Sequence, residues 1–117
     1  MTIKREQINS VDFSDLATGR RLAPVHPGAV LARDFVEAKG ISRYRLAKAM
    51  GVPQRRVDEI CAGNRAISAD TALRLERVFG MEAQVWLNLQ ARYDLETAQR
   101  GLGKRIEREA KPLEAVM

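Results

Sequence analysis

Five basic side chains lie close together near the middle of the chain, with no acidic residue among them. They fall between residues 40 and 57 and are Arg43, Arg45, Lys48, Arg55 and Arg56. Guanidinium and ammonium groups bind phosphate, and arginine also donates paired hydrogen bonds to the major-groove edge of guanine. Gln54 precedes the arginine pair and carries the amide that pairs with adenine. These residues predict nucleic-acid recognition, with a merely solvated cationic face as the alternative.

The charge of this segment equals that of the whole protein. The chain has 117 residues and a formal net charge of +5, from 20 Lys and Arg against 15 Asp and Glu. The five cations between residues 40 and 57 match that excess, so acids and bases cancel over the rest of the chain. Such a concentration of positive charge favours a polyanionic partner.

Two short helices joined by a tight turn are needed to position these side chains. Residues 43–50 and 53–62 have helical periodicity, and Ser42 is the expected N-cap of the first helix. Pro53 suits the start of the second, and Gly51 supplies the positive φ that the turn requires. This is the pattern of a helix-turn-helix motif.

The second of these helices is expected to meet DNA with its N-terminal end. Its apolar positions point inward, which leaves Gln54, Arg55 and Arg56 facing solvent in the first turn, where free N–H groups and the helix dipole attract anions. The inward residues are Val57, Ile60 and Cys61.

Other polar residues near this motif are expected to contact the phosphate backbone. Ser42 and Arg43 begin the preceding helix, and Asn64 and Arg65 follow the second one. The alternatives are that Ser42 serves only as an N-cap and that Asn64 and Arg65 belong to an ordinary loop. Glu59 is expected to be a solvent-exposed spacer rather than a reader of cytosine.

The periodicity predicts an all-α fold, a compact five-helix helix-turn-helix domain. Residues 1–25 read as a polar, partly ordered N-terminal arm, residues 26–100 as the domain, and residues 101–117 as a charged C-terminal extension, either a frayed helix or disordered. The expected helices span about 27–39, 43–50, 53–62, 69–79 with Ser68 as N-cap, and 82–100.

The apolar residues of two helices suggest how they pack. The inward stripe of the first helix is expected to contain Leu31, Phe35 and Ala38. The fifth helix has one stripe of Trp86, Leu89 and Tyr93, and further apolar residues off it at Val85, Leu87 and Leu95. Because one helix on a small bundle cannot bury both sides, the second face predicts a partner helix and a homodimer.

The composition excludes several classes of protein. A single cysteine, Cys61, cannot form an internal disulfide, and with a single histidine, His26, it cannot complete a zinc site. No catalytic triad has a plausible spacing, so we expect neither an enzyme nor a cofactor, and His26 should help to begin the first helix. No apolar run is long enough to span a membrane and no signal peptide precedes the domain, so the cytoplasm is the expected location.

The motifs resemble those of the HigA family of antitoxins, within the phage-repressor-like (XRE) helix-turn-helix group. The resemblance covers about residues 26–98. It rests on Ser-x-Tyr-x-Leu-Ala-x-x-x-Gly-Val-Pro from Ser42, on the segment that begins Gly-Asn-Arg at Gly63, and on Trp-Leu-Asn-Leu-Gln-Ala-Arg-Tyr-Asp-Leu from Trp86. The last segment distinguishes the HigA family from the larger group.

The resemblance implies a function as well as a fold. HigA-type proteins are dimers that bind palindromic operator DNA in their own promoters and neutralise a HigB-type toxin, a small basic RNase that cleaves mRNA. By position, Gln54, Arg55 and Arg56 would contact bases and phosphates, and Arg43 would support them. No residue for toxin contact is carried over, and the two terminal segments lie outside the resemblance.

Two alternatives stay open from the sequence. The first is a stand-alone transcriptional regulator with the same fold and no toxin partner. The second is a protein-interaction module whose basic face binds an acidic protein or RNA, which would show little preference between operator and random DNA.

Overall fold

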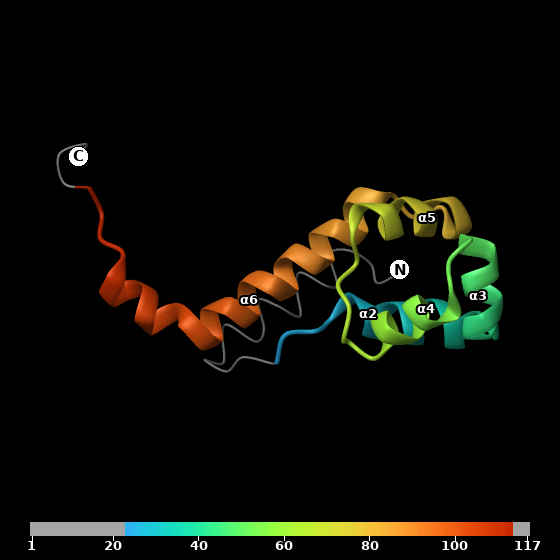
Figure 1. Cartoon of the computed structure of the whole chain (residues 1–117), viewed down its shortest axis with the longest axis horizontal. Coiled ribbons are helices and arrows are strands. Elements are labelled where there is room, and N and C mark those ends of the chain that lie inside the picture. The colour runs from blue at the N-terminus through green and yellow to red at the C-terminus, as the bar shows by residue number, and fades with distance from the viewer. Residues whose placement is uncertain (1–22, 114–117) are drawn as a thin grey trace.

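The computed structural model describes residues 23–113, and over this range the chain forms helices and no strand. The predicted all-α class is confirmed. Because α2 runs directly into a π-helical segment, η1, the two make one helix and the described residues contain the five that were expected (Figure 1). The elements are α2 (Pro27–Val30), η1 (Leu31–Glu37), α3 (Arg43–Met50), α4 (Gln54–Cys61), α5 (Ala69–Phe79) and α6 (Ala83–Glu109). Most of the predicted N-terminal arm lies outside the described residues.

The first helix begins at a histidine cap and passes very close to α4. The His26 imidazole accepts a hydrogen bond at Nδ1 from the backbone N–H of Gly28 at 2.8 Å, as expected of a helix-start residue. Gly28 is buried, and a Cβ placed on it would lie only 1.7 Å from the carbonyl oxygen of Ile60. Glycine therefore permits a backbone contact between α2 and α4 that any side chain would block.

The π-helical segment changes which residues of the first helix face inward. Leu31 and Val36, five residues apart, are buried, whereas Phe35 is half-buried and Ala38 is exposed. The predicted place of Ala38 on the inward stripe is wrong. In a π-helix the backbone hydrogen bonds join residues five apart instead of four. Val36 therefore follows Leu31 on the inward side, and Ala38 turns outward.

Local capping chemistry sets the boundaries of the following helices. The Ser42 hydroxyl accepts a hydrogen bond from the N–H of Arg45 at 3.0 Å, and the Ser68 hydroxyl accepts one from Thr71 at 3.2 Å. Gly51 ends α3 in the left-handed conformation, with φ of 74°. Both predicted N-caps and the predicted turn glycine are confirmed.

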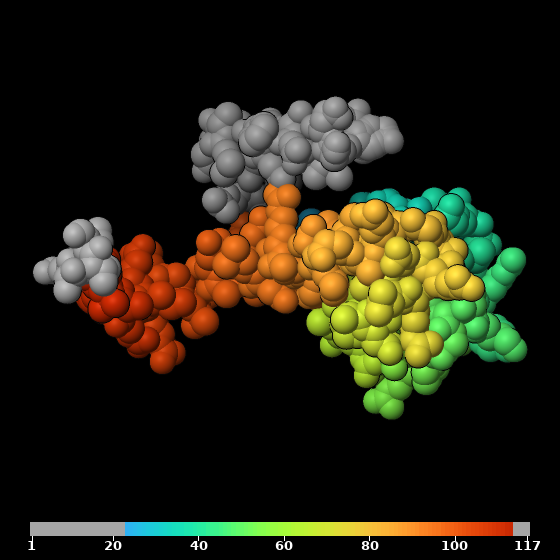
Figure 2. All heavy atoms as spheres, turned by 90° about the horizontal axis from the view of Figure 1, so that it is seen from above, coloured from blue at the N-terminus to red at the C-terminus, as the bar shows by residue number. Residues whose placement is uncertain are grey.

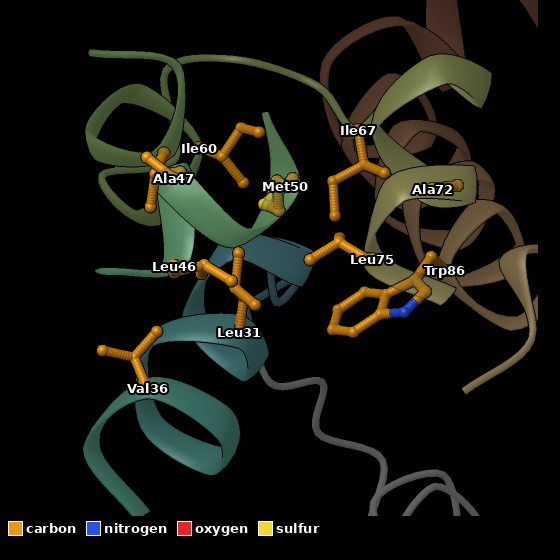
Figure 3. Packing of buried hydrophobic residues seen from close by; sticks show 11 residues of the cluster. Leu31, Val36, Leu46, Ala47, Met50, Ile60, Ile67, Ala72, Leu75 and Trp86 are labelled. Carbon is orange, nitrogen blue, oxygen red and sulfur yellow. The ribbon is translucent and has the colours of Figure 1, made fainter. Parts of the chain in front are cut away.

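The hydrophobic core joins all five helices around Trp86. Leu46, Ile60, Leu75 and the Trp86 indole have no exposed surface, and Leu75 lies beside the indole (Figure 3). The Phe35 ring lies 5.2 Å from the Trp86 ring, centroid to centroid. This core holds α3 and α4, the two helices of the motif, in a fixed orientation.

A buried glutamine ties α6 to the loop after α4. The Gln90 side-chain oxygen accepts a hydrogen bond from the backbone N–H of Ile67 at 2.8 Å, and its amide donates to Asp94 at 3.0 Å. Sequence reasoning did not single out Gln90. It lies on the inward side of α6 near Trp86 and satisfies a backbone donor that the core would otherwise leave unpaired.

The last helix is longer than the predicted 82–100. It continues through Gly101 and Gly103 to Glu109, where Arg105 and Glu109 form an i, i+4 ion pair at 2.9 Å. Its C-terminal half extends away from the other helices as a narrow arm (Figures 1 and 2). Gly101 and Gly103 have low helix propensity and lie where the predicted helix ended, but the residues around them are good helix formers. Within residues 23–113, no helix has the length and apolarity needed to cross a lipid bilayer.

Candidate DNA-binding surface

The N-terminal end of α4 is open to solvent. Its cap residue, Pro53, makes no side-chain hydrogen bond to the first turn, and that turn contains no acidic residue. Gln54 and Arg55 are exposed there, as predicted, and the Arg55 side chain has 86% of its surface accessible. The first turn thus offers unpaired N–H groups, an amide and a guanidinium to an approaching anion or base edge.

Arg56, the third residue of that turn, is placed differently. Its side chain is only 28% exposed, and its Nη1 donates a hydrogen bond to Asp70 on α5 at 2.9 Å. The prediction that Arg56 faces solvent is therefore wrong. Arg56 lies one helical turn before the buried Ile60 and so on the same side of α4, and its guanidinium reaches Asp70 at the start of α5.

Glu59 organises two of the predicted DNA-contacting arginines. Its Oε2 accepts from Nε of Arg55 at 2.9 Å, and its Oε1 pairs with Nε of Arg65 at 3.1 Å. Glu59 is half-buried, so the expectation of an exposed spacer is wrong. The Glu59 carboxylate thus holds two guanidinium groups, that of Arg55 on α4 and that of Arg65 on the loop that follows.

The remaining predicted contacts surround the start of α4. Arg43 lies 3.7 Å from Asp58, and the backbone N–H of the exposed Asn64 donates to the carbonyl of Glu59 at 2.9 Å. The hydroxyl of Ser42 is occupied as an acceptor by its capping bond, but its own hydrogen is still available as a donor. The structure places these residues near α4, while their roles towards DNA stay predictions.

The paired acids change the electrostatics of this surface. All four predicted DNA-contacting arginines form ion pairs with acids outside residues 40–57, namely Arg43 with Asp58, Arg55 and Arg65 with Glu59, and Arg56 with Asp70. The local excess of positive charge seen in the sequence is therefore partly neutralised in the fold. Hydrogen bonds from Arg74 and then Arg56 lower the pKa of the Asp70 carboxyl, which stays ionised down to low pH.

Asp70 and Arg74 are polar residues of this region that sequence reasoning missed. Nε of Arg74 donates to Asp70 at 2.8 Å, and its Nη1 donates to the carbonyl of Met50 at the end of α3 at 2.8 Å. The i, i+4 spacing of Asp70 and Arg74 predicts their own pairing. No local signal reveals that the pair also reaches α3 and α4.

The single cysteine and the single histidine of the chain both have structural roles in the fold. Cys61 is half-buried, and burial raises the pKa of its thiol, which therefore stays protonated. His26 is engaged as the cap of α2 and lies edge-on to the ring of Tyr93 at 4.9 Å. No group of three or more metal-ligating side chains occurs in the part of the chain that the structure describes.

Comparison with known proteins agrees with this geometry. The helix-turn-helix family matches residues 33–86, from η1 to the first turn of α6. Virulence-associated protein I of Dichelobacter nodosus is 48% identical over 75 residues, which cover 64% of this chain and 69% of the relative.

Solved structures extend the match to almost four fifths of the chain. An addiction module antidote protein of the HigA family from Coxiella burnetii is 43% identical, with a TM-score of 0.75 over 79% of this chain and 100% of its own. The chain belongs to the HigA family of helix-turn-helix proteins. Another member, the Pseudomonas aeruginosa antitoxin HigA solved with the higBA promoter, is 46% identical over 77% of this chain and 98% of its own, with a TM-score of 0.74. The resemblance read from Trp86 onward in this chain is confirmed.

Proposed function

We propose that this HigA-family chain represses its own operon by binding a palindromic operator as a dimer, and that it neutralises a HigB-type toxin. The observation that carries the DNA-binding part is the open first turn of α4, where Gln54 and Arg55 are exposed at an uncapped helix end. The Pseudomonas aeruginosa relative, solved with promoter DNA, supports the same use of the fold.

Two classes of contact divide the work on DNA. Gln54 and Arg55 read base edges in the major groove, because they alone among the first-turn residues point outward. Ser42, Arg43, Asn64 and Arg65 contact phosphates on either side and fix the register of the helix. On binding DNA, Arg43 and Arg65 exchange their carboxylate partners for phosphate, and Arg55 exchanges Glu59 for a base edge. These exchanges lower the net gain in free energy from each contact.

Operator binding is tested with a fluorescent duplex carrying the promoter that precedes the gene. We expect strong preference over a random duplex and steep loss of affinity with added salt. Replacing Arg55 by Gln should cost about 1–3 kcal/mol on the operator and relax selectivity at one base pair. Arg33→Gln is the matched control, because Arg33 is an exposed, ion-paired arginine on η1, away from α4. Equal affinity of the wild-type chain for both duplexes would contradict operator binding and favour the interaction module.

A dimer would form through the apolar face that α6 leaves uncovered. Leu95, Leu102 and Ile106 are about half exposed and recur at spacings of seven and four residues, which places them on one side of the helix. The predicted second face of Val85, Leu87 and Leu95 is wrong for Leu87, which packs against the core, whereas Leu95 continues into the exposed stripe towards the C-terminus. Binding to a palindrome requires that this pairing place the two α4 ends on successive turns of the major groove, about 34 Å apart.

The dimer is tested by sedimentation of the full chain at micromolar concentration. Leu102→Glu should give monomers and weaken operator binding, because two half-sites are then no longer bound together. Thr97→Glu, an exposed position away from the stripe, adds the same charge and should leave the dimer intact. A wild-type monomer that stays monomeric on operator DNA would contradict the proposal.

The antitoxin function is tested separately. Co-expression with the small basic protein encoded next to this gene should yield a stable complex and restore growth. Selective operator binding without complex formation or rescue would instead identify a stand-alone transcriptional regulator.

A further inference from the structure

A cluster of three charged side chains connects both helices of the motif to α5. A single oxygen of Asp70, Oδ1, accepts hydrogen bonds from Nη1 of Arg56 at 2.9 Å and from Nε of Arg74 at 2.8 Å. The other branch of the Arg74 guanidinium donates to the carbonyl of Met50 at 2.8 Å. The cluster therefore runs from the first turn of α4, across the start of α5, to the last turn of α3.

The Arg74 end of the cluster sits against the turn of the motif. Its Nη1 lies 3.5 Å from the carbonyl of Gly51 and 3.2 Å from where a Cβ on Gly51 would stand. The carbonyls at the end of α3 lack partners within their own helix, and Arg74 supplies one. The angle at which the chain leaves α3 and enters α4 is thus held from α5.

The Arg56 side chain at the other end of the cluster is partly covered, although its bond to Asp70 lies at the surface. The Nε atom of Arg56 is buried with no hydrogen-bond partner, and both the low exposure of the side chain and its bond to Asp70 direct the guanidinium towards α5. A residue that contacts bases needs an exposed side chain, as Arg55 has.

We infer that Arg56, Asp70 and Arg74 are positioning residues that set the orientation of α4 on DNA and thereby its selectivity, without contacting bases themselves. The inference rests on the proposed operator binding. Base-edge hydrogen bonds require narrow distances and angles, whereas phosphate contacts tolerate a tilt of the helix. Loosening the cluster therefore lowers affinity for the operator more than affinity for random DNA.

Asp70→Asn separates this role from simple electrostatics. Asparagine keeps the size of the side chain but loses the charge that binds two guanidinium groups. We expect operator affinity to fall by roughly tenfold, the order of couplings within one hydrogen-bond network, with random-duplex affinity unchanged or slightly raised. If Asp70 only repels DNA, removing its charge raises the affinity for the operator and for the random duplex equally. If Arg56 contacts DNA directly, its release strengthens the operator complex. Either result would overturn the inference.

Three further variants complete the test. Arg56→Gln should reproduce the loss of selectivity, and the Arg56→Gln/Asp70→Asn double variant should add little to it, because both break the same link. Arg74→Lys keeps the charge but has one nitrogen where two are needed, so it should not preserve selectivity. Arg77→Gln removes a charge from an exposed position of the same helix and serves as the control.

Folding and function are separated in the same experiment. Circular dichroism melting establishes that each variant is folded at the assay temperature. If Asp70→Asn is unfolded, Arg74→Lys is used to test the inference instead. A wild-type chain without operator preference defeats the proposed function. A selective wild type whose folded cluster variants keep the same operator-to-random ratio defeats this inference alone.

Discussion

The close contact between α2 and α4 makes Gly28 the position where the smallest substitution should have the largest effect. An alanine Cβ there would lie 1.7 Å from the carbonyl oxygen of Ile60 and 2.6 Å from the carbonyl carbon, both backbone atoms. Cβ contacts closer than 3.0 Å essentially do not occur, so the two helices must separate by about 1.3 Å. The Ile60 carbonyl cannot rotate away without losing the hydrogen bond that it accepts from the N–H of Gly63 at 3.0 Å.

This separation disturbs the core. Ile60 and Leu31 are fully buried near this contact, and a shift of α4 opens gaps around them as well as straining the backbone. Overpacking typically costs 1–3 kcal/mol, and a clash with backbone belongs at about 3 kcal/mol or above. In a domain of this size that corresponds to a melting temperature lower by about 12 °C or more.

Thermal denaturation followed by circular dichroism measures this cost for Gly28→Ala. Gly101→Ala is the matched control, because Gly101 is also helical but an added Cβ meets no atom within 4 Å. The control should gain about 0.4–1 kcal/mol, since alanine restricts the unfolded chain and favours the helix. If Gly28→Ala melted within 2–3 °C of the wild type, roughly the shift for half a kcal/mol, the close approach of α2 to α4 would be refuted.

Further predictions concern the core, the cap of α2 and the charge of the DNA-binding surface. Trp86→Ala should lower the free energy of unfolding by about 3–5 kcal/mol, because the indole is wholly buried. An unchanged midpoint in a denaturant titration would disprove this. Burial lowers the pKa of His26 from its ordinary value of 6.5, so folding favours the neutral cap. The cap's contribution to stability should therefore be complete above pH 6.5 and decline as the pH falls through the folded-state pKa. His26→Asn keeps a capping acceptor, so its melting temperature should fall less than that of the wild type over the same pH range. Glu59→Gln should raise affinity for random DNA, because it releases Arg55 and Arg65, and a fluorescence titration that shows no rise would count against this role.

The features that followed from the sequence are those governed by neighbours along the chain. Ser42 and Gly51 set the limits of α3 through bonds and dihedral angles within a few residues, and they could be predicted for that reason. The exposure of Arg55 followed from the periodicity of α4 in the same way. The motif from Trp86 onward identified the family, which the comparisons confirm.

Local reasoning failed where the backbone departed from the expected helix. The π-helical turn rotates Ala38 out of the core, and the spacing of apolar residues does not predict such a turn. The glycines at 101 and 103 suggested an end for the last helix, yet α6 continues to Glu109. Gly28 reads in the sequence as a weak helix residue, and only the position of Ile60 shows why glycine is needed there.

The amino-acid order alone thus determined five helices, the caps at His26, Ser42 and Ser68, the turn of the motif and the outward direction of Arg55, because each depends on bonds spanning at most a few residues. Tertiary structure alone decided which carboxylate each arginine meets. Arg56 and Asp70 are fourteen residues apart, and Arg74 reaches Met50 across twenty-four. Ion pairs of this kind form wherever packing of the apolar faces happens to bring charges within reach, so no pattern of spacing encodes them, and the charge that DNA meets is settled only when the chain has folded.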